Sequence, residues 1–141
     1  SGRGFRQMSI FIDTSAFLAI LDKDDEHHNP AAEVWRNILI STETLVTNNY
    51  VLVETCALVQ HRLGMAAVEV FQEDIIPVLQ IQWIDHAAHQ AAVGIMLTAK
   101  RKKLSLVDCV SFETMRRLGI KTSFTLDRHF KEQGFKCLPK K

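Results

Sequence analysis

The sequence predicts an α/β protein in which a mostly parallel central sheet carries helices on both faces. Short apolar, β-prone runs alternate with stretches of helical spacing along the whole chain. The 141 residues are 47% hydrophobic and 23% charged, which is typical of one soluble globular domain with a substantial core. No internal repeat, low-complexity segment or linker interrupts the alternation. A single domain is therefore expected.

The first half of the chain begins with the β-prone run 9–12 and an apolar pattern that predicts a helix directly after it. Pro30 suits the first turn of a later helix, and Gly64 is a typical helix stop. The acidic residues before Pro30 are adjacent in sequence and would not converge from one face, so they indicate a solvated loop. The expected elements are strand 9–12, helix 14–21, loop 22–30, helix 31–40, strand 45–47, a helix from Asn48-Asn49 to Leu63, and helix 65–74.

The second half opens with alternating apolar residues that predict a strand. Asp85 begins a long helix, and Ser105 with Asp108 matches the S-x-x-D capping pattern of another. Gly119 and Gly134 end the last two helices. The expected elements are strand 79–84, helix 85–99, helix 105–118, strand 120–125, a short helix from Arg128 to Gly134, and an edge strand 136–138.

Bulk properties exclude several classes of protein. With a net charge of only +1, the protein as a whole does not attract a nucleic acid electrostatically. A nucleic-acid partner would therefore have to be held by a local basic patch or through a metal ion. No apolar run approaches the roughly 20 residues of a membrane span, and no signal pattern is visible, so no membrane partner is expected. The three cysteines are widely spaced, which favours a reducing cytoplasm. Residues 1–7 are mostly polar and precede Met8; we interpret them as an expression-tag remnant before a domain over 8–141.

Four carboxylates occupy comparable junctions between elements. Asp13 and Asp127 follow short apolar strands, whereas Glu54 and Asp108 lie in the first turns of helices. In a parallel sheet such positions lie toward one edge, where the side chains can converge. Converging carboxylates repel one another unless a cation lies between them, and hard oxygen ligands suit Mg²⁺ or Mn²⁺. Such ions activate water and polarise phosphodiesters.

Each of these features also has a purely structural explanation. Asp13 is a preferred helix N-cap, and Asp108 is the third residue of a capping box. The basic run Lys100, Arg101, Lys102 and Lys103 either complements a helix C-terminus or binds RNA phosphates beside a site, and both roles are compatible. The six histidines form no metal-binding pattern and are interpreted as surface or core residues.

Four motifs, taken together and in order, resemble those of the PIN domain family, most closely its bacterial VapC-type branch. They are Ile10-Phe11-Ile12-Asp13-Thr14-Ser15, Val53-Glu54-Thr55, Leu104-Ser105-Leu106-Val107-Asp108 and Thr125-Leu126-Asp127-Arg128-His129-Phe130. The resemblance covers Met8 to Leu138 and implies a three-layer α/β/α metal-dependent ribonuclease. It implies that Asp13 and Asp108 bind Mg²⁺ (or Mn²⁺), that Glu54 and Asp127 complete the acidic pocket, and that the Ser15 and Thr125 hydroxyls support it.

The resemblance also implies a homodimer, an RNA substrate and a neutralising antitoxin protein. A nuclease that cuts structured DNA is an alternative, although the chain lacks insertions that would clamp a duplex. A non-catalytic binding module is a second alternative, but all four acids are present. Phosphoryl transfer through Asp13 as nucleophile needs a second acid where Ser15 stands, and it is set aside.

Overall fold

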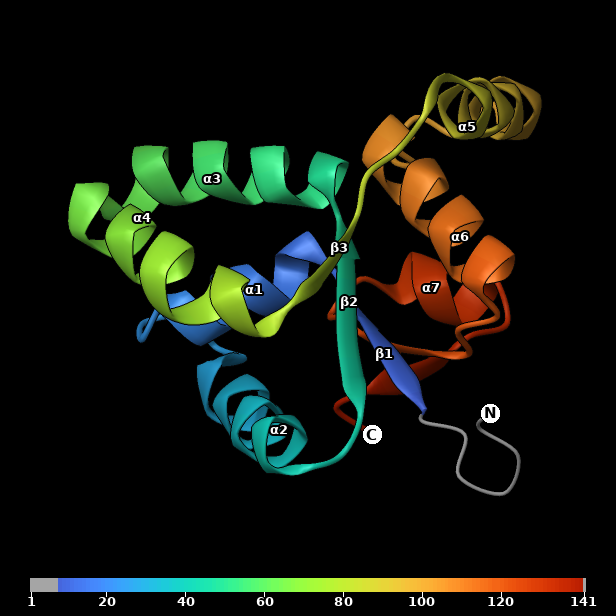
Figure 1. The fold of residues 1–141 in the computed structure, drawn as a ribbon. Coiled ribbons are helices and arrows are strands. Elements are labelled where there is room, and N and C mark those ends of the chain that lie inside the picture. Colours follow the sequence, from blue (N-terminus) through green and yellow to red (C-terminus); the bar gives the residue numbers. More distant parts are fainter. Residues whose placement is uncertain (1–7, 141) are drawn as a thin grey trace.

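The computed structural model describes residues 8–140, so the tag interpreted at residues 1–7 lies outside the described residues. Five strands form one sheet in the order β3-β2-β1-β4-β5 (Figure 1). Every neighbouring pair is parallel, which confirms the predicted sheet. The strands are β1 (Ser9–Ile12), β2 (Thr44–Asn48), β3 (Gln80–Gln82), β4 (Thr122–Phe124) and β5 (Lys136–Leu138).

The helices cover both faces of the sheet, as the predicted α/β class requires. From β1 the chain adds β2 and β3 on one side and later β4 and β5 on the other. Because crossovers between parallel strands are right-handed, the first group of helices packs on one face and the second group on the opposite face (Figure 1). The first group is α1 (Thr14–Leu21), α2 (His28–Ile40), α3 (Asn49–Leu63) and α4 (Met65–Val70); the second is α5 (His86–Ala99), α6 (Leu106–Leu118) and α7 (Arg128–Glu132).

Two predicted elements differ in form or length in the structure. The helix expected over 65–74 leaves α-geometry after Val70, continues as a π-helical turn over Phe71–Ile75, and ends in a 3₁₀ turn at Ile76–Val78. The turn places both Phe71 and Ile75 in the core, and Pro77 cannot donate to a continuing helix. The strand expected over 79–84 is short, because the Ile84 amide donates to the Asn49 side chain instead of a neighbouring strand.

The other differences lie at element ends. Helix α2 begins at His28, three residues before the predicted start, and Pro30 occupies its first turn as expected. Strand β4 is shorter than 120–125, because the Ile120 amide caps α6 by donating to the Met115 carbonyl at 2.8 Å. Within residues 8–140, no helix is both long and apolar enough to cross a membrane.

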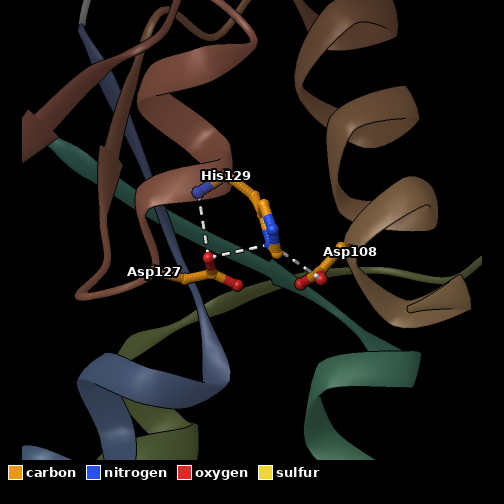
Figure 2. A group of neighbouring side chains, drawn as sticks. All are labelled: Asp108, Asp127 and His129. Atoms are coloured by element: carbon orange, nitrogen blue, oxygen red, sulfur yellow. Dashed lines mark hydrogen bonds and ion pairs between the residues drawn. The ribbon is translucent and has the colours of Figure 1, made fainter. Parts of the chain in front are cut away.

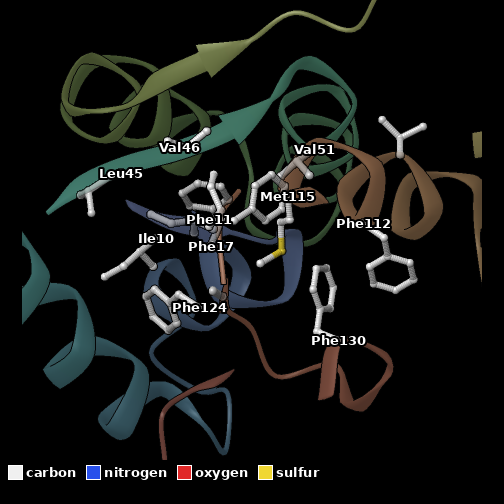
Figure 3. Packing of buried hydrophobic residues seen from close by; sticks show 14 of the residues in the cluster. Ile10, Phe11, Phe17, Leu45, Val46, Val51, Phe112, Met115, Phe124 and Phe130 are labelled. Atoms are coloured by element: carbon white, nitrogen blue, oxygen red, sulfur yellow. The ribbon is translucent and has the colours of Figure 1, made fainter. Parts of the chain in front are cut away.

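The core contains a row of phenylalanine side chains that holds α6 and α7 against the sheet (Figure 3). Phe130 of α7 stacks on Phe11 of β1 with ring centroids 6.3 Å apart, and Phe112 of α6 meets its edge at 4.9 Å. All three are fully buried. Burial of each such side chain stabilises the fold by roughly 1.5–3 kcal/mol. The five-residue helix α7 is therefore fixed by Phe130 rather than by its own helix propensity.

Candidate active site

The site lies at the topological switch point of the sheet, between β1 and β4. The chain leaves β1 toward β2 on one side, and it returns to β4 on the other side. At such a point the carboxyl ends of the strands diverge and open a crevice where α/β proteins bind ligands. Asp13 follows β1 directly, and Thr125 and Asp127 follow β4. The sheet topology therefore brings residues separated by more than a hundred positions to one place.

Asp13 is 3% exposed and occupies the N-cap position of α1, but its carboxylate makes no capping hydrogen bond. It accepts hydrogen bonds from Ser15 Oγ at 2.9 Å and from Thr125 Oγ1 at 3.0 Å, both on Oδ2. These two hydroxyls hold the carboxylate away from the amides of α1. The interpretation of Asp13 as a side-chain helix cap is therefore wrong.

The two hydroxyls also connect the loop after β1 to the loop after β4. Ser15 Oγ accepts a hydrogen bond from the Leu126 amide at 2.9 Å, and Thr125 Oγ1 accepts one from the Asp127 amide at 2.9 Å. Their oxygens lie 3.2 Å apart. Each hydroxyl has one hydrogen, and both hydrogens point at Asp13. One small network thus sets the positions of Asp13 and Asp127 together.

Asp108 begins α6 as half of a capping box, as the S-x-x-D pattern predicts. Ser105 Oγ accepts a hydrogen bond from the Asp108 amide at 3.1 Å, and Asp108 Oδ2 accepts one from the Ser105 amide at 3.2 Å. The residue is only 9% exposed, which confirms the expected inward position. The capping box therefore fixes the position of the nearly buried Asp108 carboxylate.

The buried acids are difficult to ionise in the absence of a cation. Burial raises the pKa of Asp13 to about 7; hydrogen bonds from Ser15 and Thr125 lower it, and the charges of Asp108 and Asp127 raise it. Burial likewise raises the pKa of Asp108 to about 6, with a further contribution from the Asp127 charge. A bound cation reverses this balance, because it stabilises the ionised form of every carboxylate around it. The donor set and its electrostatics therefore fit a divalent metal ion.

His129 joins the acids although its sequence context gave no such signal. Asp127 caps α7 by accepting a hydrogen bond from the His129 backbone amide at 2.9 Å. This turn also brings the His129 imidazole next to the Asp127 carboxylate. His129 Nδ1 lies 3.0 Å from Asp127 Oδ1 and 3.7 Å from Asp108 Oδ2 (Figure 2). One potential ligand atom from each of these three residues lies within 4.8 Å of the others. The interpretation of this histidine as an ordinary surface or core residue missed its place in the site.

Glu54 is not drawn into the cluster by a direct contact. It lies half-exposed in the second turn of α3, and among residues 8–140 it forms no hydrogen bond or ion pair. Its neighbour Val53 is 70% exposed, so the apolar surroundings expected for Glu54 are absent on that side. The contacts in the structure therefore unite three of the four predicted acids.

The basic run lies in the exposed loop that leads into α6. Lys100 is the C-cap of α5, with a left-handed φ of 53°. Arg101 bonds Glu132 of α7 at 3.1 Å. Lys100 therefore has the predicted place at a helix C-terminus. Lys102 and Lys103 have no ion-pair partner among the described residues, and they lie on the segment that leads to Asp108.

A parallel sheet with carboxylates gathered at its switch point is the architecture of a metal-dependent α/β enzyme, and metal-dependent nucleases are one such class. Comparison with known protein families gives the same class: the PIN domain model matches residues 10–136, and the chain belongs to this family. The resemblance inferred from the four motifs is thereby confirmed.

Individual relatives extend the comparison. The chain is 29% identical over 127 residues to the 23S rRNA-specific endonuclease VapC20 of Mycobacterium tuberculosis, covering 89% of this chain and 95% of that protein. The crystal structure of VapC20, described as a Sarcin-Ricin loop cleaving toxin, superimposes with a TM-score of 0.81 at 27% identity, over 89% of this chain and 95% of VapC20. FitAcB from Neisseria gonorrhoeae shares the fold, with a TM-score of 0.66 at 17% identity over 91% of this chain and 95% of the other. The predicted three-layer fold is confirmed.

Proposed function

We propose that this protein is a metal-dependent endoribonuclease and the toxin component of a toxin–antitoxin pair. The observation that carries the proposal is the convergence of Asp13, Asp108 and Asp127, with the pKa values of Asp13 and Asp108 raised to about 7 and about 6. Carboxylates held in this state are suited to bind a divalent ion. The similarity to VapC20, an rRNA endonuclease, supports RNA as the substrate.

In this proposal Asp13 and Asp108 are the principal ligands of Mg²⁺ or Mn²⁺. When bound, such an ion activates water and neutralises charge on the scissile phosphodiester. Asp127 completes the acidic pocket beside Asp108, while Glu54 acts through water from α3. Ser15 and Thr125 hold Asp13 Oδ2 with their hydroxyl hydrogens, which leaves Oδ1 without a hydrogen-bond partner among the described residues and available to the ion.

The substrate and partners follow from the surroundings of the site and from the relatives. Lys100, Arg101, Lys102 and Lys103 lie on the loop preceding α6 and contact RNA phosphates in this proposal. Ribosomal RNA is the first substrate to test, because VapC20 acts on 23S rRNA. In this proposal an antitoxin protein covers the site, as the resemblance to VapC-type toxins implies. We further propose a homodimer that works in the cytoplasm.

The decisive experiment measures cleavage of purified ribosomal RNA with added Mg²⁺ or Mn²⁺. We expect cleavage that EDTA abolishes, and that Asp13→Asn and Asp108→Asn each reduce by at least about a hundredfold. Asp24→Asn, in an exposed loop, is the matched control and should cleave normally. Cleavage that survives both active-site substitutions in folded protein would show that the site is misassigned. DNA of the same sequence, if cut equally well, would contradict the assignment as a ribonuclease.

The toxin role needs a cellular measurement. Expression of the unaltered chain should arrest growth, and expression of the Asp13→Asn variant should not. A small DNA-binding protein encoded next to this gene, which relieves the arrest when co-expressed, would identify the antitoxin. Growth that is unaffected by an active nuclease would refute the toxin role and leave the ribonuclease assignment intact.

A further inference from the structure

We infer that His129 is a direct nitrogen ligand of the divalent ion, which makes the centre a mixed nitrogen–oxygen site that selects Mn²⁺ over Mg²⁺. This inference rests on the proposed metal-dependent site and names a ligand that the four-acid pattern does not contain. It is carried by the position of His129 Nδ1, which lies between the carboxylates of Asp108 and Asp127 (Figure 2).

The distances match those between ligands of one octahedral ion. Two atoms bound at about 2.1 Å and at right angles lie about 3.0 Å apart, and atoms on opposite sides lie about 4.2 Å apart. His129 Nδ1 is 3.0 Å from Asp127 Oδ1 and 3.7 Å from Asp108 Oδ2. Both distances fall within this range. Since one ligand atom from each of the three residues lies within 4.8 Å of the others, a single ion placed between them can reach all three.

The Nδ1 atom lies within ion-pair distance of both carboxylates but donates to neither in hydrogen-bond geometry. It is buried and makes no hydrogen bond among the described residues, in spite of its short distance to Asp127. The nearby Asp127 Oδ1 already accepts the His129 backbone amide. Buried polar atoms in proteins nearly always form hydrogen bonds, so a buried imidazole nitrogen that faces two carboxylates without one is well placed to share a cation with them. The His129 side chain is only 9% exposed, so bulk water has little access to hydrogen-bond this nitrogen.

The backbone holds this nitrogen in place before any ion binds. Asp127 caps the first turn of α7. The next residue after His129, Phe130, is fully buried between Phe11 and Phe112. The backbone that carries the His129 imidazole is therefore rigid, as a preorganised metal ligand requires.

The donor set determines which metal the site prefers. Mg²⁺ is bound mainly by carboxylates, phosphates and water, and it gains little from an imidazole. Imidazole nitrogen instead favours first-row transition ions, and its presence shifts a carboxylate site toward them. We therefore expect His129 to strengthen Mn²⁺ binding specifically, while the carboxylates serve both ions.

The test detects the nitrogen itself rather than activity. The unaltered chain is stripped with EDTA, loaded with Mn²⁺ in a nitrogen-free buffer, and studied by pulsed electron paramagnetic resonance. We expect a ¹⁴N coupling to the manganese, replaced by a ¹⁵N coupling when the protein is made with ¹⁵N-labelled histidine. His129→Gln should abolish this coupling and weaken Mn²⁺ binding by at least about tenfold in calorimetry, with a much smaller change for Mg²⁺. His61→Gln, an exposed histidine on α3, is the matched control and should retain the coupling.

The possible outcomes separate this inference from the proposed function. Bound Mn²⁺ without histidine coupling in the unaltered chain, or coupling that persists in His129→Gln, overturns the ligand assignment, whether or not RNA is cut. Histidine coupling in a chain that cuts no RNA supports the ligand and refutes the ribonuclease. If His129→Gln does not fold, the labelling experiment still decides, because His129 is the one histidine in the metal-competent cluster found among residues 8–140.

Discussion

Replacement of Asp13 by Asn should stabilise the metal-free protein while abolishing its activity. Asp13 is 3% exposed, and burial raises its pKa from 3.8 to about 7. Because each pKa unit corresponds to about 1.4 kcal/mol, the ionised carboxylate destabilises the folded state by roughly 4 kcal/mol above pH 7. Asn is isosteric and uncharged. Its side-chain oxygen can still accept from Ser15 and Thr125, whereas burial of an unpaired amide N–H costs about 1–3 kcal/mol. The net gain expected at pH 8 is therefore about 1–3 kcal/mol.

The pH dependence provides the sharper test, since the amide penalty is the same at every pH. The folded-state pKa is raised, so the destabilisation is absent below the unfolded value of 3.8, grows as pH rises, and is complete above about 7. At pH 5 the folded carboxyl is mostly protonated, and the destabilisation falls to roughly 2 kcal/mol. The advantage of Asp13→Asn should therefore be larger at pH 8 than at pH 5 by roughly 2–3 kcal/mol.

Urea unfolding followed by circular dichroism, in the presence of EDTA, measures both quantities. Asp24→Asn is the control and should match the unaltered chain at both pH values, because Asp24 is exposed. Addition of Mn²⁺ should stabilise the unaltered chain and leave Asp13→Asn almost unchanged, since the variant lacks a principal ligand. An Asp13→Asn variant that is less stable than the unaltered chain at pH 8 without metal would refute the argument from burial.

Three other changes test parts of the structure separately. Thr125→Val removes a hydroxyl that both donates and accepts in the network, so kcat should fall by about 10–100-fold in RNA cleavage assays while the fold survives; an unchanged kcat would disprove a positioning role. Phe130→Ala should lower the free energy of unfolding by about 3–5 kcal/mol in urea titrations, and a loss below 1 kcal/mol would contradict its anchoring role. Joint replacement of Lys102 and Lys103 by Ala should raise KM for RNA without changing kcat. The slope of log affinity against log salt concentration should become shallower by about 0.7 for each phosphate contact that is lost. Lys121→Ala, before β4, is the control, and an equal effect there would refute a local RNA contact.

The sheet and the approach of three of the four predicted acids could be read from the sequence, because both depend on local signals. A short apolar run that ends in a polar residue marks the carboxyl end of a strand, as at Asp13. The capping pattern at Ser105 and Asp108 specifies its own hydrogen bonds, so the start of α6 could be predicted correctly. Parallel topology then brings these positions together without further information.

The rest depends on contacts between distant residues. His129 looked ordinary, because its burial comes from the packing of Phe130 against Phe11 and Phe112, which no local pattern reveals. The π-helical turn after Val70 likewise reflects packing of Phe71 on Phe17, with centroids 5.2 Å apart. Asp13 failed as a helix cap because Thr125, contributed by a distant loop, holds its carboxylate.

The order of strands in the sheet also controls when during synthesis the protein acquires its active form. Strand β1 is made first, but one of its two neighbours is β4, which begins at Thr122. A nascent chain that lacks the last twenty or so residues has no Thr125 to hold Asp13, no Asp127 and no His129. A PIN domain built in this way gathers its acidic residues only when synthesis of the chain is nearly complete. The interleaved order of the strands thus delays assembly of the acidic site until the whole sheet can form.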